Sequence, residues 1–310
     1  MSVWIRRFMW VSIGALLLLA LALAAAVWRG TYRLGQRHAV QVLPQPQPLP
    51  ASVATPERAR YLYVRFGCAG CHGDTGAGKV MWSSASNVIR SSHIAPGPGS
   101  ATAGYRSDDW VRAVRHGLGK DGRALLMMPS VDFQRVSDAD LAAVAAHVAG
   151  LPAQTTRGEG HQLGWLMRAL IGVGVIPLAP DRLEPGVQPS PAQTPAVTAQ
   201  WGGYVAQTCV GCHGQSLSGG PIPGMPPGTP PAANLTAIAD GAMARYANFA
   251  EFRTMFKTGR RADGSAVAVM PFESLAQLDD TDLAALYVYI KSLPARVTGT
   301  HGEARRVVQR

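Results

Sequence analysis

The most apolar stretch of the chain lies close to its N-terminus, where residues 8–28 form 21 consecutive positions without a charge. A helix of this length spans roughly 30 Å, the thickness of the hydrocarbon core of a bilayer. The alternative is a cleaved signal peptide, since Arg6 and Arg7 precede the stretch and residues 22–24 (ALA) resemble a cleavage site. Because the stretch continues past that site to Trp28, we favour a retained membrane-spanning helix.

The remainder of the chain repeats its pattern of apolar and polar positions. The segment Ser137–Pro152 (SDADLAAVAAHVAGLP) matches Asp279–Pro294 (DDTDLAALYVYIKSLP), and Met128-Pro129 matches Met270-Pro271. Self-similarity at a fixed spacing is the signature of a duplicated unit. The sequence therefore predicts two domains of the same fold.

Helical periodicity and capping residues predict the same three helices in each half. They are expected at 56–66, 107–116 and 137–150 in the first half, and at 199–207, 249–258 and 279–292 in the second. The last helix of each half begins with a cap and an acidic first turn, Ser137-Asp138 or Asp279-Asp280, and ends at Leu-Pro. Almost nothing in the pattern indicates strands, so the predicted fold class is all-α.

Composition divides the chain further. The expected parts are an anchor with its flank (1–40), a Pro-rich spacer (41–55), a first domain (56–152), a linker (153–198), a second domain (199–296) and a basic tail (297–310). Within the linker, Leu163–Leu178 is mostly apolar but too short and too interrupted to span a membrane. We expect it to form a helix packed between the two domains, with contact to a membrane surface as the second interpretation.

The chemistry of the chain is indicated by a pentapeptide that occurs once in each half. It reads Cys68-Ala69-Gly70-Cys71-His72 in the first and Cys209-Val210-Gly211-Cys212-His213 in the second, and together the copies use all four cysteines. This is the spacing of covalent haem c attachment, in which two thiols bind the porphyrin edge and the adjacent histidine binds the iron. A four-cysteine zinc site is the alternative, but it would leave both histidines without a role.

Each haem iron needs a second axial ligand opposite its histidine. Met128 and Met270 lie at matching places in the repeat, and each is followed by proline. Thioether sulfur stabilises ferrous iron, so His/Met ligation is typical of electron transfer. For the first haem, Met127, His93 and His116 are alternatives, but the repeat selects Met128.

The bond that orients each proximal histidine is expected in the loop after its motif. A backbone carbonyl there can accept the proton of the other ring nitrogen and fix the ring plane. Prolines in these loops, Pro96 or Pro98 and Pro230 or Pro231, are the candidates.

Charge changes this interpretation little. The net charge is +10, and only 15% of residues are charged against 47% hydrophobic. The Lys and Arg residues are scattered and form no aromatic-interleaved cluster, so we expect no nucleic-acid partner. An acidic redox protein or an anionic membrane surface fits the charge better.

On these motifs the chain resembles membrane-anchored dihaem proteins with two class I cytochrome c domains, over about residues 56–152 and 199–294. The resemblance implies one haem c in each domain, a redox-relay role and no catalytic residues. It also implies attachment to the bacterial inner membrane by a single span, with both haem domains in the periplasm. The first domain departs from the family in its loop 80–100, which lacks the Asn-Leu-Thr that the second domain has at 234–236.

Three functions compete. The leading hypothesis is a relay of single electrons from a quinol- or substrate-oxidising donor to a respiratory acceptor such as a terminal oxidase. The second is the cytochrome c subunit of a periplasmic dehydrogenase complex, with catalysis in another subunit. A dihaem peroxidase or a sulfur-oxidising cytochrome is disfavoured, because the chain has no spare cysteine and offers a methionine to each haem.

Overall fold

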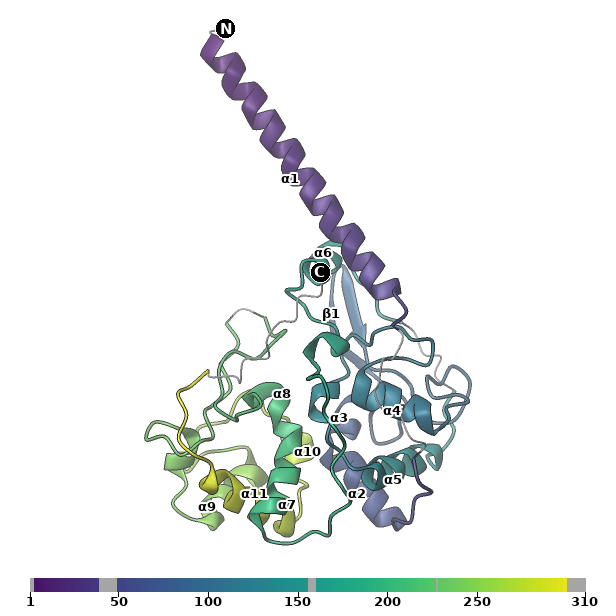
Figure 1. Ribbon diagram of the computed structural model, residues 1–310, viewed down its shortest axis with the longest axis vertical. Coiled ribbons are helices and arrows are strands. Elements are labelled where there is room, and N and C mark those ends of the chain that lie inside the picture. Colours follow the sequence, from purple (N-terminus) through teal and green to yellow (C-terminus); the bar gives the residue numbers. More distant parts are fainter. Residues whose placement is uncertain (1–2, 39–48, 156–159, 227, 300–310) are drawn as a thin grey trace.

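The computed structural model describes residues 3–38, 49–155, 160–226 and 228–299. Residues 41–48 of the expected spacer and 300–310 of the expected basic tail lie outside the described residues. The first element is α1 (Val3–Gly35), a helix of 33 residues that projects away from the rest of the chain (Figure 1). Its most apolar 18 residues are not buried in the protein, and its length and composition suffice to cross a membrane.

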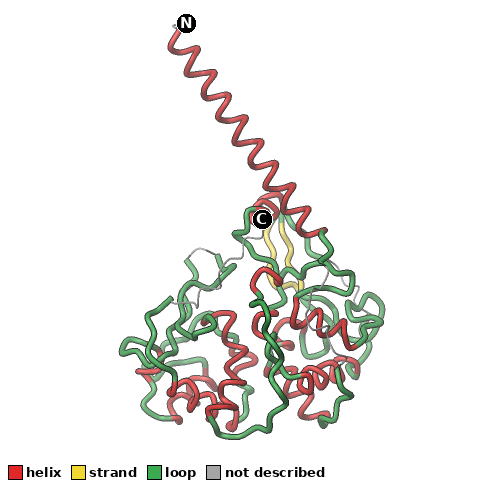
Figure 2. The backbone as a smooth tube through the Cα atoms, in the orientation of Figure 1, coloured by secondary structure: helices red, strands yellow, loops and turns green. Residues whose placement is uncertain are grey.

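Two helical domains lie side by side beneath α1 (Figures 1 and 2). The first contains α2 (Pro56–Arg65), α3 (Cys68–His72), α4 (Ser107–His116), η1 (Ser130–Asp132) and α5 (Asp138–Ala149). The second contains α7 (Ala199–Val205), η3 (Ala206–Cys209), α8 (Val210–His213), η4 (Ala242–Arg245), α9 (Phe249–Thr258), α10 (Phe272–Leu275) and α11 (Asp280–Ser292). The predicted all-α class is therefore confirmed.

The final helices begin where their sequence predicts. The Ser137 hydroxyl accepts a hydrogen bond from the Asp140 amide at 3.1 Å, and the Asp279 carboxylate accepts one from the Asp282 amide at 2.7 Å. In the second domain α11 packs closely on α7, because a Cβ at Gly202 would lie only 2.0 Å from the Ala285 carbonyl oxygen. A side chain at this position would push the two helices apart.

A β-hairpin interrupts the helical pattern in the first domain. Strands β1 (Val80–Ser84) and β2 (Asn87–Arg90) pair antiparallel within loop 80–100, where the first half departs from the second. The Val88 and Gln162 amides each donate to the other's carbonyl, which joins the hairpin to the linker. The hairpin is the strand content that the sequence pattern did not predict.

The linker contains α6 (Trp165–Gly172) and η2 (Ala179–Arg182). Our expectation that residues 163–178 pack between the domains was wrong, because α6 lies along the C-terminal part of α1 (Figure 1). The two backbones touch: a Cβ at Gly30 would lie 1.8 Å from the Arg168 carbonyl oxygen. Two facing glycines, Gly30 and Gly172, permit this approach.

A small apolar cluster, which we call the neck, fixes α1 to the first domain. Its buried members are Ile89, Leu126, Ile171 and Leu178, and Leu34 from α1 packs against them. The Arg33 guanidinium donates to the Ile171 carbonyl at 2.6 Å and forms an ion pair with Asp181, and the His38 amide donates to the Gly122 carbonyl at 2.8 Å. The anchor helix is thus attached to the first domain by packing as well as by the chain.

A buried ion pair lies at the interface between the two domains. Arg65 of α2 and Asp282 of α11 have side chains that are 1% and 0% exposed, with Nε and Oδ2 3.1 Å apart. The guanidinium also lies over the rings of Phe66, Trp201 and Tyr204. Removing two charges from water is costly unless each is compensated.

Further hydrogen bonds compensate the Asp282 carboxylate, and one of them has a counterpart at the equivalent place in the other domain. The Trp201 indole donates to Asp282 Oδ1 at 2.6 Å, and the Tyr61 hydroxyl donates to Oδ2 at 2.7 Å. In the opposite sense, the Tyr204 hydroxyl of the second domain donates to Asp140 of the first at 2.6 Å. Each domain therefore supplies a tyrosine to the first turn of the other domain's final helix.

We predict that Asp282→Ala strongly destabilises the protein. The substitution leaves the Arg65 charge buried and the Trp201 and Tyr61 donors without their acceptor, a loss of about 3–5 kcal/mol for a buried pair. Denaturant unfolding followed by circular dichroism measures it. The matched control is Asp280→Ala on the same helix, because the Arg253–Asp280 pair is exposed and screened by solvent. Equal stability of the two variants would contradict a structural role for the buried pair.

Candidate functional site

The first Cys-X-X-Cys-His motif forms α3 and opens onto an apolar cavity in the first domain. The cavity is lined by α2, α3, α4, α5 and the loops between them; its lining includes Tyr63, Phe66, Cys68, His72, Ser92, Tyr105, Trp110, Val114, Met128, Phe133 and Val144. Met128 lies 60 residues after Cys68 in the sequence, yet it shares one cavity with Cys68 and His72. An apolar cavity with few polar groups is the usual form of a cofactor site.

Both motif histidines are held in the same way. His72 Nδ1 donates to the Ser92 carbonyl at 2.8 Å, and His213 Nδ1 donates to the Ala233 carbonyl at 2.8 Å. A carbonyl oxygen can only accept, so the proton is on Nδ1 and the lone pair of Nε2 is free to bind a metal. Burial lowers the pKa of both rings, which favours the neutral form that ligation needs.

The acceptors differ from those we expected. We assigned this role to the carbonyls of Pro96 or Pro98 and of Pro230 or Pro231, and that assignment is wrong. The true acceptors are Ser92, which lies before Pro96, and Ala233, which lies after Pro231; each is 20 residues after the histidine of its motif. Proline is frequent throughout both loops, so composition alone could not select the residue.

The four cysteines suit covalent attachment better than metal ligation. All are free thiols, and burial raises the pKa of Cys68 and of Cys209 to about 12. A metal site needs thiolates, which such pKa values disfavour. Among the described residues, no group of three or more His, Cys, Asp or Glu side chains could hold a metal ion. The zinc alternative therefore has no support in the geometry.

The structure separates Met128 from the alternatives considered for the first haem. Met128 lines the cavity, whereas the adjacent Met127 is 56% exposed and is not part of its lining. His93 and His116 are likewise absent from the lining. His93 is buried, and neither of its ring nitrogens has a hydrogen-bond partner.

In the second domain Met270 packs against the core together with Cys209. It follows Val269, whose φ of +73° is unusual for a β-branched residue. Such a conformation costs of order 1–3 kcal/mol and persists only where the surroundings fix it. The local hydrogen bonds repeat those of the first domain, since the Ser130 amide donates to the Met128 carbonyl and the Phe272 amide to the Met270 carbonyl, both at 2.9 Å.

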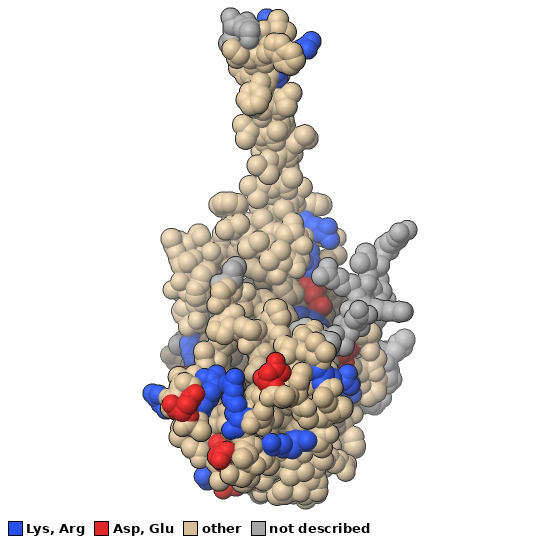
Figure 3. All heavy atoms as spheres, turned by 90° about the vertical axis from the view of Figure 1, so that its left-hand side faces the viewer, with Lys and Arg blue, Asp and Glu red and all other residues tan. Residues whose placement is uncertain are grey.

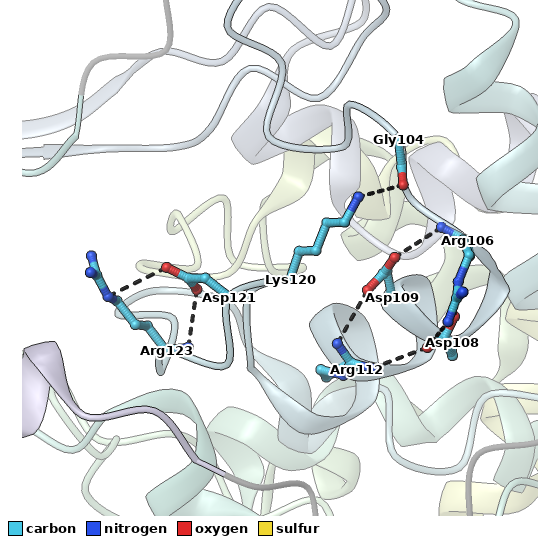
Figure 4. Close-up of polar contacts among 8 residues, drawn as sticks. All are labelled: Gly104, Arg106, Asp108, Asp109, Arg112, Lys120, Asp121 and Arg123. Carbon is cyan, nitrogen blue, oxygen red and sulfur yellow. Dashed lines mark hydrogen bonds and ion pairs between the residues drawn. The ribbon is translucent and has the colours of Figure 1, made fainter.

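A polar network on the outside of the first domain holds two walls of its cavity (Figure 4). Asp109 accepts from the Arg106 amide at the start of α4 and from Arg112 one turn later. Lys120 donates to the Gly104 carbonyl at 2.6 Å, which fixes the loop before α4. These contacts position α4 and Tyr105 against the cavity, and the Asp109 carboxylate at their centre is buried.

The methionine loop of the first domain contacts the motif of the second. Asp132, four residues after Met128, accepts a hydrogen bond from the Gly211 amide. Arg182 of the linker donates to the Gly211 carbonyl at 2.6 Å. The amide and the carbonyl of Gly211, which lies between Cys209 and Cys212, are thus both bound by groups from outside the second domain.

Burial raises the pKa of Asp132 to about 7, although the Gly211 hydrogen bond and the Arg182 charge oppose this. No sequence pattern pointed to Asp132, because the residue at its place in the second repeat is Ser274.

The reverse contact is also present. Ser274 of α10, four residues after Met270, lies against the first motif, and a Cβ at Gly70 would be 3.4 Å from its hydroxyl oxygen. The charge of the neighbouring Glu273 adds to burial in raising the pKa of Cys71. Each methionine loop therefore touches the other domain's motif.

Comparison with known proteins assigns a family to both halves. Residues 54–148 match the family model described as cytochrome c oxidase, cbb3-type, subunit III, and residues 203–294 match the model described as cytochrome c. The two matches cover the domains that contain the repeated motifs.

Several curated proteins are similar over most of the chain. The cytochrome c subunit of a quinone alcohol dehydrogenase from Gluconobacter oxydans is 27% identical, covering 88% of this chain and 60% of the relative. The gluconate 2-dehydrogenase cytochrome c subunit of Pantoea cypripedii is 26% identical (79% and 61%), and the fructose dehydrogenase cytochrome subunit of Gluconobacter japonicus is 27% identical (81% and 55%).

The chain spans about 60% of the length of the curated relatives it matches. The repeated motifs, the two family matches and these relatives agree on one assignment. The protein belongs to the cytochrome c family and consists of an apolar N-terminal helix followed by two haem c domains in tandem.

Proposed function

We propose that the protein relays single electrons through two haem c groups, one in each domain. Thioether bonds would join the first haem to Cys68 and Cys71, and the second to Cys209 and Cys212, by addition of each thiol to a vinyl group. The axial ligands would be His72 with Met128 and His213 with Met270. The shared cavity of Cys68, His72 and Met128 supports this set for the first haem.

Haem c supplies reversible one-electron chemistry when it is bound, and the surrounding residues set its conditions. The carbonyls of Ser92 and Ala233 orient the two imidazoles and leave Nε2 available. Aromatic and aliphatic side chains exclude water from the first cavity. Methionine sulfur would favour the reduced state, and a methionine and a histidine on each iron would leave no place for a substrate.

The observation that carries the relay is the reciprocal contact between the domains. Asp132 bonds the backbone between Cys209 and Cys212, and Ser274 lies against Gly70 of the other motif. The ligand loop of each domain therefore abuts the attachment site of the other. We infer that electrons pass between the two haems within one chain.

We further propose that the donor is the catalytic subunit of a membrane-bound dehydrogenase and that the acceptor is a component of the respiratory chain. Three curated relatives are cytochrome subunits of dehydrogenases, and this favours the second of our functional hypotheses over a free-standing relay. With α1 as a single-pass anchor in the bacterial inner membrane, both haem domains would face the periplasm. On the face shown in Figure 3, positive and negative side chains are interspersed, which suits a protein partner better than a nucleic acid.

Met128→Ala and Met270→Ala are each expected to remove about half of the weak far-red absorption band that Met–iron ligation gives in oxidised cytochromes. Each substitution deletes one of two sulfur ligands, so the double variant loses the band. Met127→Ala is the matched control and leaves the spectrum unchanged, since this side chain is exposed. A full band in Met128→Ala would contradict our ligand assignment for the first haem.

The reduced native protein is expected not to bind carbon monoxide rapidly, because both irons are saturated. Affinity purification from membranes is expected to recover a cofactor-bearing dehydrogenase subunit in constant ratio. Fast carbon monoxide binding would favour an enzyme with an open haem. A cytochrome that purifies alone but is oxidised by the terminal oxidase would favour the free-standing relay.

The reduction potential of the second haem is expected to fall as pH rises through about 7, where Asp132 ionises, because a nearby negative charge stabilises ferric iron. Asp132→Asn removes this charge and is expected to reduce the fall of the potential with pH by on the order of tens of millivolts. Spectroelectrochemical titration at several pH values measures both haems, and Ser274→Ala is the control at the matching position. An unchanged pH dependence in Asp132→Asn would show that Asp132 does not act on this haem.

A further inference from the structure

Helix α6 and the turn after it adjoin the neck and have exposed apolar side chains on the side away from it. On α6 Trp165 is 58% exposed and Leu166 is 54% exposed; in the turn that follows, Val173 and Val175 are 62% and 61% exposed. Four large apolar side chains on one short helix and its turn are more than a soluble surface usually leaves open. They are continuous with α1, on which α6 packs (Figure 1).

The contacts along α1 place this surface relative to the apolar segment. Near the start of α6, Arg168 donates to the Thr31 hydroxyl at 3.4 Å. One turn later, a Cβ at Gly172 would lie 2.0 Å from the Ala26 carbonyl oxygen. The helix α6 therefore runs antiparallel to α1 and reaches a level two residues inside Trp28, roughly 3 Å along the axis.

The turn after α6 has the backbone bonding that an apolar environment requires. The Val173 amide donates to the Ala169 carbonyl at 2.9 Å, and the Val175 amide donates to the Leu170 carbonyl at 2.9 Å. The Gly174 amide donates to Ile171 at 3.2 Å. Backbone donors left without partners exclude most turns from a bilayer, and this turn has none among its three amides.

We propose that α6 and the turn Val173–Val175 insert into the interface of the membrane that α1 crosses, so that the protein contacts lipid at two places. Val173 and Val175 would reach the acyl chains, and Trp165 would lie at the level of the headgroups, where tryptophan is favoured. The exposed Arg29, one residue beyond Trp28, suits anionic headgroups at this level. The proposal rests on α1 being the membrane anchor.

Because the neck also holds the first domain, this second contact would limit how far that domain tilts relative to the membrane plane. A single helix can tilt in the bilayer, whereas tilting a helix with an inserted neighbour would lift that neighbour's apolar side chains out of the lipid. The first haem domain would then stand at a set angle to the membrane surface.

The test uses the full-length holoprotein in lipid nanodiscs of phosphatidylcholine and phosphatidylglycerol. Single variants Val175→Cys, Val197→Cys and Leu18→Cys are treated with a membrane-impermeant maleimide, and the wild type gives the background of its own cysteines. Val197 is the matched control, because it is a valine of similar exposure (57%) on the linker ahead of α7. Rates in denaturing detergent correct for intrinsic reactivity.

We expect Val175→Cys to react at least about tenfold more slowly than Val197→Cys, since a thiol in lipid does not form the thiolate that attacks. Equal rates at 175 and 197 with a protected Leu18→Cys would overturn the second contact and leave the anchor intact. A fast reaction at Leu18→Cys would overturn the anchor itself and with it this inference.

A second protein molecule that covers position 175 would also slow the maleimide reaction. A nitroxide label at the same position distinguishes such a cover from lipid. The ratio of the label's collision rate with oxygen to its collision rate with a water-soluble nickel chelate is expected to be higher at Val175→Cys than at Val197→Cys, because oxygen concentrates in lipid. Low accessibility to both reagents would identify a protein cover and overturn the proposal.

Discussion

The arrangement of the two domains depends on a charge that neither domain can bury alone. Arg65 is inaccessible to solvent, and its counter-ion Asp282 belongs to the other domain. Separation of the domains would expose the indole and hydroxyl partners of the carboxylate and the aromatic faces around the guanidinium. A buried pair whose halves lie in different domains favours one relative position, because only that position compensates both charges.

This position brings each methionine loop to the other domain's motif. Arg65 ends α2, three residues before Cys68, and Asp282 lies in the first turn of α11, shortly after the loop that carries Met270. The residues that join the domains are thus close in sequence to those that we assign to the haems. An interface built this way links the stability of the pair of domains to the geometry of the electron path.

The two halves use one plan with different details where they meet the rest of the chain. The first has a hairpin that joins the neck, whereas the second has in the same loop an Asn234 that holds Arg296 and Thr298 of its own C-terminal segment. Asp132 and Ser274 take the same place but only the first carries a charge. The haem sites of the two similar domains therefore have different electrostatic surroundings.

The sequence by itself determined the elements whose causes are local. The motifs, the repeat, the capped helices starting at Ser137 and Asp279, and the apolar helix of residues 8–28 all follow from spacing, caps and periodicity. The tertiary structure alone decided which carbonyls hold the histidines, where α6 packs and that Asp132 binds Gly211. These depend on contacts between residues far apart in the chain, and a single sequence carries no signal for them. Residues 163–178 show the difference: their apolar pattern predicted a buried face, but the close contact between Gly30 of α1 and Gly172 of α6 determined which neighbour buries it.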